Sequence, residues 1–465
     1  MIRKIKRHTG SQSRFNIPKR GRIRFILIIA LIAAAVKITG AIIQDNPQPK
    51  EITEQKEKRQ KKPKLKKPPK ETTKKVNLGK EADFQEIKNL ISHHGIDVNK
   101  TSQLIINGKD SLTFSLSIDT MLQEYALSLF QRYHPRYGAV AALDPVTGRI
   151  LALISYTNQG ETDKGKALYL KSIFPAASVF KTITAAAGIE SAHMTAQSTI
   201  PHSGRNHTLY KFQLQKELKQ YKDISLEEAY AMSINPAFAR IALYMLEKGV
   251  LEDFGKRFGF NSPIPFELEP DVSEMFTPDS DFAIAEFASG FNEQTTISPL
   301  FGALLASSIS EGGEIPCPTI VDSVYSSEKD TCIYTRSTKV WRKAIQESTA
   351  DELKKLMRKV PIYGTARKSF RTLRQSTRFN EYEYGGKTGS VSKQDLGRVD
   401  WFVGFARHPQ DPAQRIAVGV VTTHGDYWTV HSSYIASELF RMFLRKKQDQ
   451  KTEKIAAIEA SQQNN

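Results

Sequence analysis

The chain has 465 residues and a formal net charge of +18, from 67 Lys and Arg against 49 Asp and Glu. This length allows one large domain with a sizeable core, plus appendages. The excess charge is confined to two segments: residues 1–24 carry nine Lys or Arg and no acid, and residues 50–80 carry thirteen against four Glu. Because the remaining residues sum to zero and no nucleic-acid-binding motif is present, we expect no nucleic-acid partner.

The first eighty residues predict a membrane anchor on a tether. Residues 1–24 form a basic leader, and the nineteen residues 25–43 are apolar at all but two positions. That length approaches what spans a bilayer, and the basic leader places the N-terminus in the cytoplasm. A cleaved signal peptide, with a site at Ala33-Ala34-Ala35, is the alternative. Residues 44–80 are rich in Lys and Pro and predict a disordered linker, because they cannot bury a core.

Residues 81–111 form a small segment beside the main domain, too short to fold alone. Four apolar residues at helical spacing indicate an amphipathic helix there: Phe84, Ile87, Leu90 and Ile91. Asn107-Gly108 lies between two apolar runs and predicts a β-hairpin. Alternation from Leu112 predicts a strand, and Asp119 is suited to cap the helix that follows.

The large domain, residues 112–446, begins and ends in predicted strands. Residues 137–156 predict two strands joined by a tight turn. A mostly helical region follows to about residue 310, strands return over residues 382–423, and a helix is expected over 434–444. Strands from both ends of the domain should therefore form one antiparallel sheet with a helical lobe inserted between them.

Three further features concern cross-links, metals and the C-terminus. Cys317 and Cys332 lie in a β-like stretch, and in an exported chain they could either pair or stay free. The chain contains neither H-E-x-x-H nor C-x-x-C, so we expect no metal and no cofactor. Residues 447–465 are polar and predict a disordered tail.

Three short motifs stand in order within the large domain. Ser178-Val179-Phe180-Lys181 pairs a hydroxyl with an amine at the start of an apolar, helix-prone run; the two other S-x-x-K matches, at Ser326 and Ser390, lack that context. Ser233-Ile234-Asn235 adds a hydroxyl and an amide at a link between two predicted helices. Lys387-Thr388-Gly389-Ser390 adds a cation, two hydroxyls and backbone N–H groups. Together they predict serine acyl transfer on a substrate with a free carboxylate.

The order and spacing of these motifs resemble the penicillin-binding protein family, the peptidoglycan D,D-transpeptidases, which carry S-x-x-K, S-x-N and K-T-G. Four flanking segments add to the resemblance: residues 143–152, 235–239, 364–366 and 400–405. Two positions depart from it, because Ala176-Ala177 precede the serine and Ser390 replaces the commoner threonine. The resemblance implies an α/β (α+β) transpeptidase fold: an antiparallel five-stranded sheet flanked by helices, with an inserted all-helical lobe.

The chemistry and the resemblance together imply four catalytic residues. Lys181, kept neutral by burial and by the nearby charge of Lys387, would take the proton of Ser178. Ser178 would then attack the carbonyl of the penultimate residue of a stem peptide that ends in D-Ala-D-Ala. The N–H groups of Ser178 and Ser390 would stabilise the oxyanion. Ser233 would relay a proton to the departing D-Ala.

The same reasoning implies the substrate-binding residues. Asn235 would hydrogen-bond the peptide backbone. The charge of Lys387 would attract the terminal carboxylate, which the third-motif residues Thr388, Gly389 and Ser390 would bind. An amine from a neighbouring strand would then release the acyl-enzyme as a cross-link, and a β-lactam, which mimics D-Ala-D-Ala, would acylate Ser178.

Three alternative functions stay open at this stage. A β-lactamase needs a positioned base for water, and Glu267-Leu268-Glu269-Pro270, expected to be a surface loop, is a poor substitute for an E-x-x-L-N segment. A D,D-carboxypeptidase would use water in place of the amine. A non-catalytic scaffold of a cell-wall synthesis complex would bind other cell-wall proteins. The favoured interpretation is a single-pass transpeptidase of the cytoplasmic membrane, with its catalytic domain outside and peptidoglycan stem peptides as substrate.

Overall fold

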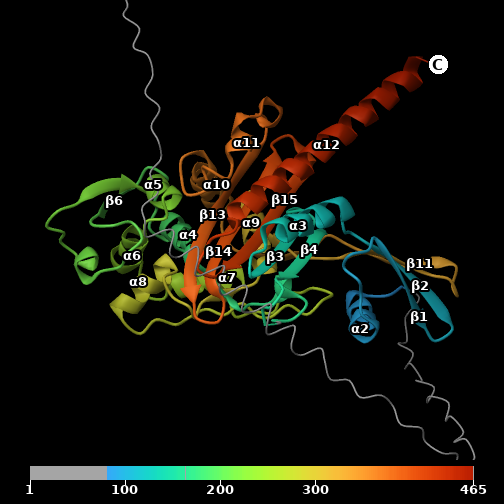
Figure 1. Ribbon diagram of the computed structural model, residues 1–465, viewed down its shortest axis with the longest axis horizontal. Helices are drawn as coiled ribbons and strands as arrows, with labels where there is room; N and C mark the ends of the chain where they lie inside the picture. Colours follow the sequence, from blue (N-terminus) through green and yellow to red (C-terminus); the bar gives the residue numbers. More distant parts are fainter. Residues whose placement is uncertain (1–80, 163, 464–465) are drawn as a thin grey trace, which may run out of the picture. The chain divides into compact units, whose positions relative to one another are not determined.

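The structure is a computed structural model and describes residues 81–162 and 164–463 (Figure 1). At its centre is a five-stranded antiparallel sheet in the order β13-β14-β15-β3-β4. The strands are β3 (Tyr137–Leu143), β4 (Ile150–Thr157), β13 (Glu383–Lys393), β14 (Gly397–His408) and β15 (Asp411–His424). The prediction of one antiparallel sheet built from both ends of the large domain is therefore confirmed.

Helices cover both faces of this central sheet. Helix α9 (Pro299–Ser310) packs on β14, β15 and β3, while α12 (Ser432–Gln463) packs on β14 and β15 beside α3 (Thr120–Tyr133) (Figure 1). Every residue of α9 is buried, which its sequence permits because it carries no charged side chain. Strand β3 is likewise buried along its whole length, as expected of a strand covered on both faces.

The lobe inserted between β4 and β13 is mostly helical. Its helices are η1 (Leu168–Leu170), η2 (Ala177–Phe180), α4 (Lys181–Ser191), η3 (Lys211–Leu214), α5 (Leu226–Ala231), α6 (Asn235–Tyr244), α7 (Val250–Phe258) and α8 (Asp281–Ser289). An all-helical lobe was predicted, but the lobe also contains two short pairs of strands. Strand β5 (Phe174–Pro175) pairs with β8 (Thr296–Ile297), and β6 (Thr199–His202) pairs with β7 (Lys222–Ser225). The β5–β8 pair fixes the segment that leads into the first motif.

A second, four-stranded sheet has the order β1-β2-β10-β11. Its strands are β1 (Ser102–Asn107), β2 (Asp110–Leu116), β10 (Val321–Ser326) and β11 (Thr331–Thr335), and α2 (Phe84–His94) precedes them. The predicted amphipathic helix and Asn-Gly hairpin are confirmed. The boundary predicted at residue 112 falls within β2, so the hairpin ties residues 81–111 to the following chain.

Two short strands and three helices complete the fold. The remaining elements are β9 (Glu314–Pro316), which pairs with β12 (Val340–Lys343), then α10 (Glu347–Ile362), α11 (Arg371–Gln375) and η4 (Thr377–Phe379). Helix α10 packs against β13 and against α4 and α5 of the lobe. Cys317 and Cys332 are both free thiols.

The C-terminal residues differ from their prediction. Helix α12 was expected to end near residue 444, with disorder beyond 446, but it continues to Gln463. Residues 447–463 contain no Gly or Pro and are rich in Lys, Glu, Gln and Ala, all strong helix formers, so nothing in the sequence ends the helix. The Arg378 side chain also donates to Gln448 Oε1 at 2.6 Å, which holds this part of the helix to η4.

The predicted leader, membrane anchor and linker, residues 1–80, lie outside the described residues. Within the described part of the chain, no helix has the length and apolar character required to cross a bilayer.

Candidate active site

The first motif lies where β5 gives way to the helical lobe. Ser178 is in the 3-10 turn η2, which runs directly into α4, so the Ser178 and Lys181 side chains point the same way one helical turn apart. Ala177, just before the serine, has a φ of 49°, in the left-handed region that non-glycine residues rarely adopt. Such conformations persist only where the surroundings impose them, and here they direct Ser178 into a cavity.

Lys181 is fully buried behind Ser178. Its Nζ lies 2.6 Å from Ser178 Oγ, 2.7 Å from Asn235 Oδ1 and 2.7 Å from the carbonyl oxygen of Ser289. Burial, together with the charge of Lys387, holds the pKa of Lys181 well below its usual value. The first and second motifs are thus joined through a single amine.

The second and third motifs meet at Ser233. This residue sits between α5 and α6 with a φ of 57°, and the Nζ of Lys387 donates to its Oγ at 2.9 Å and to the Thr388 carbonyl oxygen at 2.8 Å. Lys387 is fully buried, and burial lowers its pKa to about 7. Asn235 begins α6, with its N–H donating to the Asn206 carbonyl oxygen at 2.7 Å.

The third motif lies on β13, against the turn that carries Ser178. A Cβ on Gly389 would stand 3.2 Å from the backbone nitrogens of both Ser178 and Val179, so glycine permits this close approach. The hydroxyls of Thr388 and Thr365 are 2.5 Å apart. The segment 364–366, singled out by the resemblance, therefore positions the Thr388 hydroxyl.

Gly290 supports the Ser178 turn from the end of α8. It has a φ of 65°, and a Cβ there would clash with the Ala177 carbonyl oxygen. We expect Gly290→Ala to displace the turn and to slow acylation of Ser178 by on the order of 10²-fold, the cost of a misplacement of about 1 Å. The measurement is the acylation rate with a labelled penicillin.

Gly249→Ala is the matched control for that variant. Gly249 has a φ of 86° and no atom within 4 Å of the Cβ that alanine would add, so the substitution brings only the left-handed strain of about 1–2 kcal/mol. Its acylation rate should match that of the unchanged chain. Equal rates for the two variants would show that Gly290 does not hold the turn.

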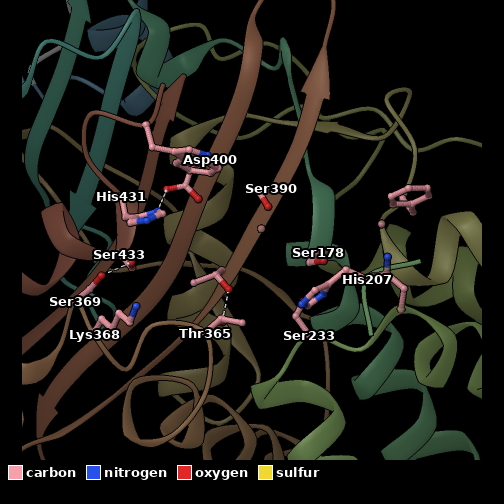
Figure 2. A pocket seen from close by; sticks show the side chains of 16 residues that line it. Ser178, His207, Ser233, Thr365, Lys368, Ser369, Ser390, Asp400, His431 and Ser433 are labelled. Atoms are coloured by element: carbon pink, nitrogen blue, oxygen red, sulfur yellow. Dashed lines mark hydrogen bonds and ion pairs between the residues drawn. The ribbon is translucent and has the colours of Figure 1, made fainter. Parts of the chain in front are cut away.

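The three motifs open into one cavity of about 320 Å³ (Figure 2). Six of the eight predicted site residues line it: Ser178, Ser233, Asn235, Thr388, Gly389 and Ser390. The two lysines, Lys181 and Lys387, lie behind this lining and reach it through Ser178 and Ser233. The structure thus brings all eight together, and it places Lys387, whose charge was expected to attract a carboxylate, behind Ser233.

Sequence reasoning missed several polar residues that line the same cavity. His207 lies beside Ser178 and Ser233, whereas Lys368, Asp400 and His431 lie at the other end (Figure 2). Burial, then the charge of Lys181, lowers the pKa of His207. Of these four residues, only Asp400 could have been found from the sequence, because it begins the segment 400–405 that resembles the penicillin-binding protein family. The other three lie outside any motif.

Glu267, expected on a surface loop, is fully buried and does not line the cavity. Its carboxylate accepts hydrogen bonds from Thr319 Oγ1 at 2.5 Å and from the Ile320 N–H at 3.3 Å. The expectation was wrong because apolar neighbours, among them Phe266, carry this segment into the core. Asp400 is the one carboxylate among the cavity-lining residues.

The fold and this geometry define a serine acyltransferase: a hydroxyl in contact with a buried amine, on a five-stranded sheet with a helical lobe. The family model "Penicillin binding protein transpeptidase domain" matches residues 138–445. The chain therefore belongs to the penicillin-binding protein transpeptidase family.

Curated relatives and solved structures agree with this assignment. "Peptidoglycan D,D-transpeptidase PbpA" of Mycobacterium tuberculosis (strain ATCC 25618 / H37Rv) is 26% identical over 345 residues, which cover 66% of this chain and 67% of PbpA. "Stage V sporulation protein D" of Bacillus subtilis (strain 168) is 23% identical, and the match covers 68% of this chain but only 51% of that protein. The crystal structure of PBPA from Mycobacterium tuberculosis shares the fold, with a TM-score of 0.58 at 20% identity over 78% of this chain and 86% of that chain. Its imipenem acyl-enzyme complex has a TM-score of 0.56 at 22% identity, over 70% and 78% respectively.

Proposed function

We propose that this chain cross-links peptidoglycan stem peptides as a D,D-transpeptidase, with Ser178 as nucleophile, and that β-lactams acylate the same serine. The observation that carries the proposal is the 2.6 Å contact between Lys181 Nζ and Ser178 Oγ at the floor of the cavity. A buried amine with a lowered pKa is suited to be a general base.

The partners of Lys181 accommodate its neutral form, which burial and the charge of Lys387 favour. Asn235 Oδ1 and the Ser289 carbonyl oxygen can only accept hydrogen bonds. A neutral amine has two N–H bonds and one lone pair, so its N–H bonds point at these two oxygens. The lone pair then faces Ser178, whose hydroxyl donates to it. Ser178 is therefore ready to lose its proton to Lys181 as Oγ attacks the substrate carbonyl.

The later proton transfers pass through Ser233. After Oγ attacks the penultimate D-Ala carbonyl, the C–N bond to the last D-Ala breaks and the leaving nitrogen needs a proton. Ser233 Oγ, which accepts from Lys387 Nζ, supplies its own proton and recovers one from that lysine. An acceptor amine then attacks the ester and forms the new amide. The proton that this amine loses restores Lys387 through Ser233, and Lys181 returns its proton to Ser178 Oγ, which is free again.

Backbone groups and hydroxyls hold the rest of the substrate. The Ser178 and Ser390 N–H groups stabilise the oxyanion, and losing one such donor typically costs on the order of 10²–10³ in rate. Asn235 binds the peptide backbone, and Thr388 and Ser390 bind the terminal carboxylate. Lys387 acts from behind them through Ser233, because it does not line the cavity.

The proposed setting follows from the predicted N-terminal segments. Residues 25–43 anchor the chain in the cytoplasmic membrane, residues 44–80 tether it, and the catalytic domain works outside the membrane on the cell wall. Other cell-wall synthesis proteins are the expected neighbours there. The name of PbpA, a peptidoglycan D,D-transpeptidase, supports the cell-wall part of this setting.

A labelled penicillin tests the function on the full chain. We expect a durable adduct that peptide mapping places on Ser178, and, with a D-Ala-D-Ala donor and an amine acceptor, release of D-Ala and a product of cross-linked mass. Rapid release of the label would instead indicate a β-lactamase. Hydrolysed donor without cross-linked product would indicate a carboxypeptidase, and absence of any adduct a scaffold.

A further inference from the structure

Two basic side chains face the cavity from outside the three motifs. Four of the cavity-lining residues are acids or bases: His207, Lys368, Asp400 and His431. Lys368 and His431 lie at the end away from Ser178, with Ser390 between (Figure 2). We call this pair the cationic end. Since Lys387 is buried behind Ser233, the cationic end holds the positive charge that a ligand can touch.

Lys368 is exposed and has no ion-pair or side-chain hydrogen-bond partner among the described residues. Its backbone is nevertheless fixed by neighbouring contacts. The next residue, Ser369, has its hydroxyl 2.7 Å from that of Ser433 in α12, and the Lys368 carbonyl oxygen accepts from the Arg371 N–H at 3.2 Å. An exposed ammonium that lines a cavity and has no partner among the described residues is suited to bind an anion.

His431 is oriented by a buried carboxylate. Its Nδ1 lies 3.5 Å from Asp400 Oδ2, and the same oxygen accepts from the Ser432 N–H at 2.7 Å. The His431 ring also packs on Trp428, with ring centroids 4.8 Å apart. Asp400 is thus occupied by its own partners, and the hydrogen bond to it raises the pKa of His431. The imidazole side chain stays 59% exposed, toward the cavity.

The sheet register brings the cationic end next to the third motif. Ser390 on β13 is paired with Asp400 on β14, and directly paired residues of antiparallel strands project from the same face. A group held by the Ser390 hydroxyl therefore lies beside the carboxylate that orients His431. The Thr388 hydroxyl, held by Thr365 at 2.5 Å, belongs to the same wall.

We propose that Lys368 and His431 form the cationic half of the subsite for the free carboxylate of the acyl donor's last residue, beside the hydroxyls of Thr388 and Ser390. The inference rests on the proposed transpeptidase function, and it assigns to these two residues the charge that sequence reasoning gave to Lys387. Charged hydrogen bonds to a carboxylate are about twice as strong as neutral ones, so this end selects donors with an uncapped C-terminus.

The charge at this end depends on pH through His431. The ionisable groups around that ring are Asp400 on β14, Lys368, and His424 on β15, with Arg398 stacked over Trp428 at 5.5 Å. Burial lowers the pKa of His424 to about 4, so His424 is neutral near pH 7. Discrimination in favour of a free carboxylate should therefore fall as pH rises through the pKa of His431.

The test compares two donors on the full chain: a peptide ending in D-Ala-D-Ala with a free carboxylate, and the same peptide as its C-terminal amide. Lys368→Gln and His431→Gln should each lower kcat/KM for the free acid by roughly ten- to one-hundredfold, the range expected for a charged hydrogen bond. For the amide, kcat/KM should change by less than about twofold in these variants, because a neutral C-terminal amide forms no ion pair with Lys368 or His431. Lys368→Arg, which keeps the charge, should retain most of the preference.

Lys109→Gln is the matched control. Lys109 is an exposed lysine in the turn between β1 and β2 and does not line the cavity, so its loss changes net charge alone. The proposal is overturned if acid and amide lose rate in parallel, or if neither loses rate in the Lys368 and His431 variants. Durable penicillin labelling of Ser178 in the unchanged chain is read separately: its absence would reject the proposed function, whereas its presence with an unchanged acid-to-amide ratio would reject only the cationic end.

Discussion

Lys181→Ala is expected to slow acylation of Ser178 by labelled penicillin by roughly 10³–10⁴-fold, at the upper end of what a general base contributes. The reason is that no other amine contacts Ser178 Oγ among the described residues: Lys387 Nζ bonds Ser233 and the Thr388 carbonyl oxygen instead. The measurement is the second-order acylation rate constant, with thermal unfolding as a check that the variant folds.

Thr184→Ala controls for the structural part of that effect. The Thr184 hydroxyl lies one turn further along α4 and donates to the Ala288 carbonyl oxygen at 2.7 Å, much as Lys181 bonds that of Ser289. Its loss should cost about 1–3 kcal/mol of stability, because a buried acceptor loses its partner. If Thr184→Ala slowed acylation as much as Lys181→Ala, the lysine would be a structural tie and not the base.

Lys387 should impose a descending limb on the pH profile of acylation. Burial lowers its pKa to about 7, so its cation is lost as pH rises through that value, together with the proton it supplies to Ser233. Lys181 acts in the opposite sense, since its base form grows with pH. The product is a bell-shaped profile, and Lys387→Ala should lower the maximum by on the order of 10²–10³-fold.

Stability should move the other way over the same range, which separates the two effects. Between about 7 and 10.5 the unfolded chain binds a proton at Lys387 that the folded chain does not, so the free energy of unfolding rises with pH there. Acylation rates and thermal unfolding measured across about pH 6–10 check both trends. A flat rate profile, or one that rises throughout that range, would contradict the role of Lys387.

The fold could be predicted wherever local chemistry and pattern coincide. The hairpin predicted at Asn107-Gly108, the Asp119 cap and the alternation from Leu112 depend on neighbours in sequence, and the structure bears them out, with Gly108-Lys109 as the hairpin loop. The short sheets in the lobe could not be predicted, because β5 and β8 are two residues long and more than a hundred residues apart. Glu267 was misplaced for the same reason: its partners, Thr319 and Ile320, are distant in the chain.

The candidate site divides in the same way. The motif residues carry their spacing in the sequence, so Ser178, Lys181 and Asn235 were expected to converge, and their side chains do meet. Lys368 and His431 belong to segments 63 residues apart that only the Ser369–Ser433 contact and the sheet register bring to one wall. No spacing rule marks such residues. The burial of Lys387 could not be predicted either, because it depends on which distant residues pack against β13.

The sheet order has one further consequence for what this chain accepts. β13 stands at the end of the order β13-β14-β15-β3-β4, so one side of its backbone has no strand partner among the described residues. An extended peptide can bind along that side through hydrogen bonds to its main-chain atoms, which every amino acid has. Such main-chain binding would accept many side chains along the peptide, and selectivity between substrates would depend on the last residue of the peptide.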